Sequence, residues 1–441
     1  MLTEGGTARP ADGAPRAARK IPRLSRSEWV LLLVLAAMQF THIVDFVIVM
    51  PLGPKLRDAL DISLDEFGWF VSAYGISASI SGLLAALVLH RFDRKKSLLI
   101  LYAGFTVGTF VCAVAPNYAV LLVGRAVAGG FAGVMGANVL TIISDVFPES
   151  RRATAMGVVM SSFSVANIIG IYAGLEIAEH IGWRGPFAVL AVLCLPALAL
   201  AWRVLPPLRR HLEQRRSQNV SMLQVLFHPT HLRAYALTTA LMMGSWTIIP
   251  FLAIFLVNNL HWAETDLRWV WLCGGVATLL TMTPTGWLSD SRDKLFVFRV
   301  IGVLCVVPVL LITNLPAVSP MWLVLLATTL FMVSTSIRWV PAIAMITASA
   351  APHQRGSFMS VNASVQQMVM GLAPLVAGFI LGEKPDGDTR RALEGFPLVG
   401  LLAAASMLLS VALAGRLRRA AEPMKERAQQ PQEAVAEPAV F

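Results

Sequence analysis

The stretch PPLRRHLEQRRSQN, residues 206–219, is the longest polar segment between the apolar runs of this chain. Six apolar runs precede it and six follow it, and each is close to or above the roughly 20 residues that an α-helix needs to cross a bilayer. The pattern predicts an all-α polytopic membrane protein with twelve transmembrane helices in two halves of six. We place these helices near residues 29–51, 67–89, 97–115, 119–147, 154–178, 185–205, 234–257, 267–288, 295–314, 321–349, 357–382 and 395–415.

The composition agrees with this assignment. The chain has 441 residues, of which 56% are hydrophobic and 14% are charged, and its mean hydropathy is +0.66. Soluble globular proteins carry about 25% charged residues, so an ordinary soluble enzyme is excluded. Disordered and coiled-coil proteins are excluded too, because both need far more charge.

The net charge of +10 comes from Lys and Arg that lie between the apolar runs. They are concentrated in every second connection, as the positive-inside rule describes for cytoplasmic loops. We therefore expect both termini in the cytoplasm and no binding of nucleic acid.

The polar segments divide the chain into five expected regions. Residues 1–28 are expected to be a disordered cytoplasmic segment, and residues 29–205 an N-terminal six-helix bundle. Residues 206–233 are expected to be a cytoplasmic linker, and residues 234–415 a C-terminal six-helix bundle. Residues 416–441, rich in charge, Pro and Ala, are expected to be a disordered cytoplasmic tail.

No motif indicates a cofactor, a metal or an enzymatic centre. The four cysteines, at positions 112, 194, 273 and 305, lie inside apolar runs without a CxxC pair. No P-loop or Rossmann glycine pattern is present, and no span carries clustered ligands or nucleophiles. We therefore expect no cofactor, no bound metal and no enzyme.

The two halves show signs of an internal repeat. A shift of 200 residues places Trp69 on Trp269 and Asp93 on Asp293. Repeated halves around a central site are an arrangement of secondary transporters.

Two loops carry a resemblance to a known family. ALVLHRFDRKK, residues 86–96, follows the second run, and GWLSDSRDK, residues 286–294, follows the eighth. GRAVAGG with Arg125 and GIYAGL from Gly170 add to it. Together they resemble the major facilitator superfamily, and GIYAGL resembles the antiporter motif of its drug/proton antiporters.

That resemblance implies a gate at the cytoplasmic side. In the second loop Asp290 would face Arg151 and Arg152 at the start of span five; His90 or Asp93 of the first loop would face Arg355. Plain topogenic charge is the alternative interpretation. The residues assigned to the gate are His90, Arg91, Asp93, Arg151, Arg152, Asp290 and Arg355.

The first span holds an acidic residue in apolar surroundings. Gln39, His42 and Asp45 are spaced by three residues, so we expect them along one helix face. An ionisable group inside a membrane is a functional-site hypothesis, because it costs a few kcal/mol or more. Since burial disfavours a charged carboxylate, Asp45 is predicted to couple proton movement, together with His42. The 200-residue shift places Ser245 opposite Asp45, and a structural hydrogen bond of Asp45 is the alternative.

Two arginines also lie deep in apolar runs. Arg125 and Arg338 could each pair with Asp45 or bind substrate. Interhelical hydrogen bonds and lipid contact are the alternatives for the other polar and aromatic candidates. The residues assigned to a substrate cavity are Gln39, Arg125, Trp246, Arg338, Asn362, Gln366 and Gln367.

These features favour a secondary active transporter of a small molecule in the bacterial inner membrane, working by proton-coupled efflux. Proton-coupled uptake of a polar or anionic solute is one alternative. A non-transporting sensor or scaffold on the same fold is an alternative of another class. The expected partners are lipid, a small-molecule substrate and protons, and the chain is expected to be a monomer.

Overall fold

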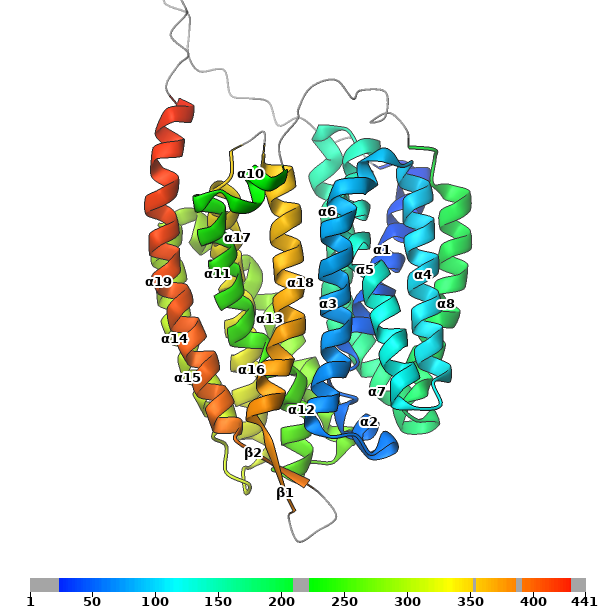
Figure 1. Cartoon of the computed structure of the whole chain (residues 1–441), viewed down its shortest axis with the longest axis vertical. Helices are drawn as coiled ribbons and strands as arrows, with labels where there is room; N and C mark the ends of the chain where they lie inside the picture. Colours follow the sequence, from blue (N-terminus) through cyan, green and yellow to red (C-terminus); the bar gives the residue numbers. More distant parts are fainter. Residues whose placement is uncertain (1–23, 209–221, 352–353, 386–390, 430–441) are drawn as a thin grey trace, which may run out of the picture.

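The structure is a computed structural model that describes residues 24–208, 222–351, 354–385 and 391–429. Two helical halves stand side by side in it (Figure 1). The predicted all-α polytopic fold with two halves is confirmed, apart from one short β-hairpin near the C-terminal end of the chain.

The N-terminal half consists of long helices joined by short turns. Its elements are α1 (Arg26–Val47), α2 (Gly53–Leu60), α3 (Leu64–Val88), η1 (Leu89–Arg91), α4 (Arg94–Val114), α5 (Tyr118–Val146), α6 (Glu149–Val165), the π-helical turn η2 (Ala166–Gly170), α7 (Ile171–Ile181) and α8 (Arg184–Val204).

Polar caps determine where several of these helices begin. Ser25 and Glu28 form a capping box at α1, and Ser63 and Glu66 form one at α3. Asn117 caps α5 by accepting a hydrogen bond from a backbone N–H. Each cap satisfies N–H groups that the first helical turn leaves without partners.

The C-terminal half contains more breaks. Its elements are α10 (Met222–Phe227), α11 (Pro229–Trp246), α12 (Ile249–Asn258), η3 (Glu264–Asp266), α13 (Leu267–Ser291), α14 (Lys294–Leu304), α15 (Val306–Thr313), α16 (Met321–Ile337), α17 (Trp339–Ala348), α18 (Arg355–Ile380), β1 (Gly382–Pro385), β2 (Arg391–Glu394) and α19 (Phe396–Gln429). Strands β1 and β2 pair antiparallel.

Three predicted spans of this half are divided into two consecutive helices. Pro250, Pro308 and Pro341 lie in the first turn of α12, α15 and α17. Proline lacks the N–H that would continue the preceding helix, but it fits the first turn of a new one. The apolar runs are therefore continuous in sequence but interrupted in backbone geometry.

Eleven helical segments of the described residues are long and apolar enough to cross a membrane. The predicted segment 267–288 is the helix α13, which is not one of the eleven. Its second half contains the polar sequence TMTPTG, residues 281–286, which lowers its hydropathy.

Some expected region boundaries differ from the structure. Helix α1 begins at Arg26, and residues 1–23 lie outside the described residues. The expected linker contains α10 and the start of α11, whereas residues 209–221 are outside the described part. The expected disordered tail is helical as far as Gln429, because its Ala, Arg, Glu and Lys residues favour helix; residues 430–441 are not described.

The two ends of the bundle are distinct. We call the end at which α8 ends and α10 begins the linker face; it is the upper end in Figure 1. The opposite end carries α2, α12 and the hairpin, and we call it the strand face (Figure 1). One apolar cluster near the strand face includes residues of both halves, such as Val47 and Phe251. Two further clusters belong to one half each.

Helices α3 and α18 form a close contact between the halves. A Cβ on Gly75 of α3 would lie 2.6 Å from the backbone nitrogen of Gly371 in α18. One turn along, the Ser79 hydroxyl donates to the carbonyl of Ser364 at 2.8 Å. Small residues permit this approach, as they do between many membrane helices.

Candidate functional site

Asp45 and Arg125 form a buried ion pair in the N-terminal half. Asp45 lies in the last turn of α1, and Arg125 lies in the second turn of α5. The Nη1 of Arg125 is 2.9 Å from Oδ2 of Asp45, and both side chains are 0% exposed. The same Nη1 also donates to the Asp45 carbonyl at 3.1 Å. Neither carboxylate oxygen therefore faces lipid.

Neighbouring helices complete the surroundings of this pair. The Thr109 hydroxyl of α4 donates to Oδ1 of Asp45 at 3.1 Å. The Arg125 guanidinium lies 4.4 Å from the Tyr74 ring centroid and 5.5 Å from that of Phe70, within the range of cation–π attraction. Gly129 permits this arrangement, since a Cβ there would collide with the backbone of Tyr74.

Several polar atoms around the Asp45–Arg125 pair make no hydrogen bond within the described residues. Nε and Nη2 of Arg125 and the hydroxyl of Tyr74 are buried without a hydrogen-bond partner among the described residues. Buried polar groups normally have partners, so these donors mark a place where a water or an acceptor group of a ligand can bind. Sequence reasoning did not single out Tyr74 or Thr109, which only the packing of α3 and α4 brings here.

The expectation that Gln39, His42 and Asp45 share one helix face is wrong for Asp45. Three residues of an α-helix advance by about 300°, so each step drifts by about 60° and Asp45 lies about 120° from Gln39. Gln39 and His42 are partly exposed, whereas Asp45 faces α4 and α5. Within the described part of the chain, Nδ1 of His42 has no hydrogen-bond partner, and its ring meets Phe105 edge-on at 6.1 Å between centroids.

Arg338 occupies a related place in the C-terminal half. It lies at the junction of α16 and α17 and is 1% exposed. Its Nη2 donates to the Leu241 carbonyl at 2.8 Å and to the Ser245 hydroxyl at 2.6 Å, both in α11. Nη1 has no hydrogen-bond partner among the described residues. Arg338 thus does not pair with Asp45.

The other predicted cavity residues divide into two groups. Asn362 is buried and accepts a hydrogen bond from Thr238 at 2.7 Å, so it joins α18 to α11. Gln366 and Gln367 are half-buried, and Oε1 of Gln367 has no hydrogen-bond partner among the described residues. Trp246 is also half-buried and contacts Phe46 of α1 at 5.3 Å between ring centroids. That aromatic contact joins the halves.

No ion pair between described side chains joins the predicted gate residues across the linker face. Arg151 pairs with Glu28 at 2.9 Å within the N-terminal half, and Arg152 donates to the Ser144 carbonyl. Asp290 is exposed, and no described ion pair connects it to either arginine.

In the first basic loop, Asp93 also makes its described contact within the N-terminal half. Asp93 caps α4 by accepting from the Lys95 N–H at 2.9 Å. Arg91 and Arg355 are exposed, and no described ion pair joins Asp93 to Arg355. The side chain of His90 lies outside the described part of the structure.

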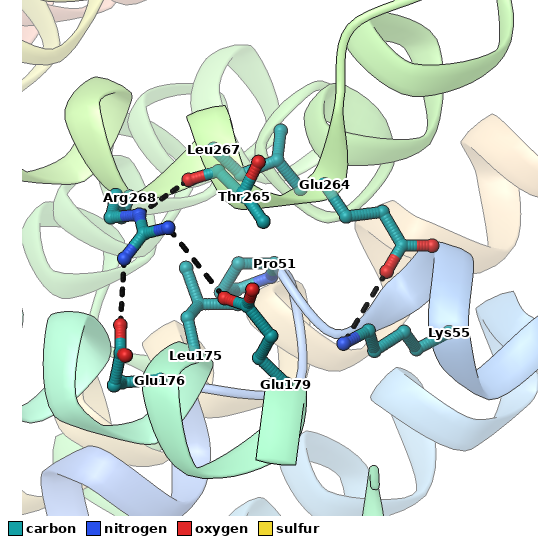
Figure 2. Close-up of a pocket in the computed structure, with 9 residues that line it drawn as sticks. All are labelled: Pro51, Lys55, Leu175, Glu176, Glu179, Glu264, Thr265, Leu267 and Arg268. Carbon is teal, nitrogen blue, oxygen red and sulfur yellow. Dashed lines mark hydrogen bonds and ion pairs between the residues drawn. The ribbon is translucent and has the colours of Figure 1, made fainter.

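Ion pairs at the strand face do connect the halves, and sequence reasoning missed them. Arg268, in the first turn of α13, contacts Glu176 at 2.6 Å and Glu179 at 3.6 Å on α7 (Figure 2). Lys55 of α2 lies 3.5 Å from Glu264 across the same pocket (Figure 2). The signal was available, because these charges lie at or near the ends of apolar runs.

The hairpin adds a second connection at this face. Asn259, which follows the last residue of α12, accepts from the Leu393 N–H and donates to its carbonyl, both at 2.9 Å, so the hairpin is attached to the C-terminal half. From there Glu383 pairs with Arg57 of α2, and Arg391 lies 3.5 Å from Asp61. All inter-half ion pairs of the described residues lie at the strand face.

Two helical halves that span a membrane and enclose buried charged groups define a multi-pass membrane transport protein. The family model of the Major Facilitator Superfamily matches residues 35–240 and 234–440, so the chain belongs to this superfamily. It is therefore a transporter and not an enzyme.

Curated relatives extend this comparison. The chain is 26% identical over 339 residues to the uncharacterized MFS-type transporter YceJ of Bacillus subtilis, which covers 76% of this chain and 85% of YceJ. It is 28% identical to the inner membrane transport protein YdhP of Escherichia coli K12, over 48% of this chain and 54% of YdhP. It is 30% identical to the rubrofusarin-specific efflux pump aurT of Gibberella zeae, over 40% of this chain and 33% of aurT.

Solved structures share the fold at low identity. A bacterial homologue of the lysosomal transporter Spinster, inward-facing and occupied, matches with a TM-score of 0.67 at 15% identity, over 92% of this chain and 98% of the homologue. A D-xylose–proton symporter matches with a TM-score of 0.68 at 14% identity, over 87% and 97% of the two chains.

Proposed function

We propose that this transporter exports a small molecule from a bacterial cell in exchange for protons. The Asp45–Arg125 ion pair supports this proposal most strongly, because both side chains are fully buried inside candidate membrane spans. Charged groups in such positions are expensive and usually serve ion or proton pathways.

We assign the linker face to the cytoplasm. The basic loops that carry Arg91, Arg151 and Arg355 lie on the side at which α1 begins and α19 ends. The positive-inside rule places such loops in the cytoplasm. Both termini are then cytoplasmic, and the strand face lies outside the cytoplasmic membrane.

With this orientation, the structure corresponds to a state closed toward the outside. The strand face holds the halves together through Arg57–Glu383, Arg268–Glu176 and a shared apolar cluster. At the linker face each half has its own apolar cluster, and no described ion pair crosses between them. Alternating access requires the strand-face contacts to break when the linker face closes.

The predicted cytoplasmic gate belongs to that other state. There Asp290 would meet Arg151 or Arg152, and Asp93 or His90 would approach Arg355. These residues lie at the linker face on opposite halves, and Asp290 and Arg355 are exposed, so they are available for such contacts.

Protonation of Asp45 provides the coupling step. A proton neutralises the carboxylate and removes the counter-charge of Arg125, and the Tyr74 ring beside the guanidinium carries no charge that could replace it. Separating a buried ion pair costs about 3–5 kcal/mol. A proton that moves down the membrane potential releases about 2.3 kcal/mol of free energy per 100 mV. The proton gradient therefore contributes substantially to this step.

His42 offers a route for the proton. It lies about one turn from Asp45 toward the linker face, on the partly exposed side of α1. Its Nδ1 has no hydrogen-bond partner among the described residues, so it is available to bind water. An imidazole can pass a proton at physiological pH. The monomer contains all of these groups, and we assign the transport unit to a single chain.

Proton-coupled uptake is the second candidate. Arg338 favours it, because a buried cation without a carboxylate partner suits an anionic solute. The direction is tested in inverted membrane vesicles that are acidified inside. Accumulation of substrate in these vesicles supports antiport. Accumulation that instead requires acid outside the vesicles, so that protons and substrate move inward together, supports symport.

A further inference from the structure

Arg338 and Ser245 form the counterpart of Arg125 and Asp45 in the other half. Each arginine comes from the fourth long helical segment of its half and reaches the first helix of that half, α1 or α11. A shift of 200 residues places Ser245 on Asp45. The N-terminal arginine therefore has a carboxylate, and the C-terminal arginine has a hydroxyl in its place.

This difference leaves one positive charge without compensation. No Asp or Glu of the described residues forms an ion pair with Arg338, whose contacts are the Leu241 carbonyl and the Ser245 hydroxyl. Its Nη1 is buried and has no hydrogen-bond partner among the described residues. A guanidinium in such surroundings is stable only with an anion or further acceptors, because the loss of hydration is not repaid by dipoles alone.

The free donors suit a carboxylate. Nη1 carries two N–H groups, and a hydrogen bond from a guanidinium to a carboxylate is charge-assisted, which makes it roughly twice as strong as a neutral one. The hydroxyl of Ser245, which accepts from Arg338, has its own proton to donate. Trp246, the next residue of α11, contacts Phe46 across the boundary between the halves, so two apolar rings lie at that boundary.

We propose that Arg338 and Ser245 bind the carboxylate of an amphipathic organic anion, whose apolar part lies against Trp246 and Phe46. This rests on the proposed transport function and names its substrate class. The transported molecule supplies to the C-terminal half the negative charge that Asp45 supplies to the N-terminal half.

The test uses two substitutions at one position. Ser245→Asp introduces the missing carboxylate next to Arg338, and Ser245→Asn is a neutral control of similar size. Without ligand, Ser245→Asp is expected to unfold at a higher temperature than Ser245→Asn, because it compensates the buried charge. A lower unfolding temperature for Ser245→Asp would overturn the proposal.

Binding is measured on the purified full chain in lipid nanodiscs, with benzoate, 1-naphthoate and 4-phenylbutyrate against their neutral amides. At least one carboxylate is expected to bind the unsubstituted protein about 10- to 100-fold more tightly than its amide, the range of a charge-assisted hydrogen bond. Ser245→Asp should lose this preference, whereas Ser245→Asn, which removes the hydroxyl but adds no competing negative charge, should reduce it less.

Equal binding of carboxylates and amides, no binding by any carboxylate, or an unchanged preference in Ser245→Asp would each contradict the proposal. These measurements need no proton gradient. Failure of proton coupling at Asp45 is therefore recognised separately, by loss of gradient-driven transport in a protein that still binds the carboxylate.

Discussion

Arg57 of α2 pairs with Glu383 of the β-hairpin, and this contact joins the two halves at the strand face. Arg57 is buried and also donates to the Ile62 carbonyl, so its guanidinium is held in place. Burial lowers the pKa of Arg57, and the Glu383 carboxylate opposes that effect. The pair thus stabilises the state that is closed at this face.

Glu383→Gln is expected to favour opening of the strand face, because it leaves the Arg57 charge unpaired. The loss of a charge-assisted hydrogen bond of about 1.5–3 kcal/mol corresponds to a shift of about tenfold or more in the ratio of states. Distances between spin labels at Asp58→Cys and Val318→Cys report this, since both positions are exposed and lie on different halves. The half-buried Cys273 is replaced by Ser in this experiment.

Glu394→Gln is the matched control. Glu394 lies on the same hairpin, but its ion pair is with Lys384, inside the hairpin and exposed. An equal distance distribution for Glu383→Gln and Glu394→Gln would show that the Arg57 contact does not control the opening.

Gly75→Ala is expected to destabilise the protein by about 1–3 kcal/mol, the usual effect of overpacking. The new methyl group would lie 2.6 Å from the backbone of α18, which cannot move as a side chain can. Gly157→Ala in α6 meets nothing within 4 Å and should instead stabilise by up to about 1 kcal/mol, since Ala favours helix. Thermal unfolding in detergent distinguishes the two, and a neutral Gly75→Ala would contradict the close contact of α3 and α18.

Tyr74→Leu is expected to lower stability more than Tyr74→Phe does. Phe keeps a ring above the Arg125 guanidinium, whereas Leu removes a cation–π contact worth about 2 kcal/mol when desolvated. The Tyr74 hydroxyl has no hydrogen-bond partner among the described residues, so its removal alone should be tolerated. Denaturant or thermal unfolding measures the difference. An equal loss of stability in Tyr74→Leu and Tyr74→Phe would show that the hydroxyl, and not the ring, stabilises the protein.

Asp290→Asn is expected to slow transport several-fold without changing thermal stability. Its predicted partners, Arg151 and Arg152, are engaged elsewhere in this structure, so the contact would form only when the linker face closes. Asp293→Asn is the control, because Asp293 pairs with Arg418 of its own half. If both variants transport at the unsubstituted rate, the proposed cytoplasmic gate is wrong.

The sequence predicted the helical architecture well for a physical reason. Transmembrane helices need long apolar runs, and such runs are visible without knowledge of tertiary contacts. The breaks at Pro250 and Pro341 depend on local backbone geometry, so continuous apolar runs concealed them.

The partners inside the site could not be derived in the same way. Asp45 and Arg125 are 80 positions apart, and sequence alone left both Arg125 and Arg338 as candidates for the pair. The choice depends on helix rotation, which turns Asp45 away from Gln39 and toward α5. The hairpin that carries Glu383 was also missed, because two strands of four residues in a polar loop have no clear hydrophobic pattern.

Gradient-driven transport by Asp45→Asn tests the central claim most directly. The purified protein is reconstituted in liposomes, and the substrate is one that the unsubstituted chain exports in cells without their own pumps. An imposed pH gradient should drive accumulation by the unsubstituted chain. Asp45→Asn should lose that accumulation but still exchange labelled for unlabelled substrate, because its amide cannot take up the proton. Accumulation by Asp45→Asn at the unsubstituted level under the same pH gradient would contradict proton coupling through Asp45.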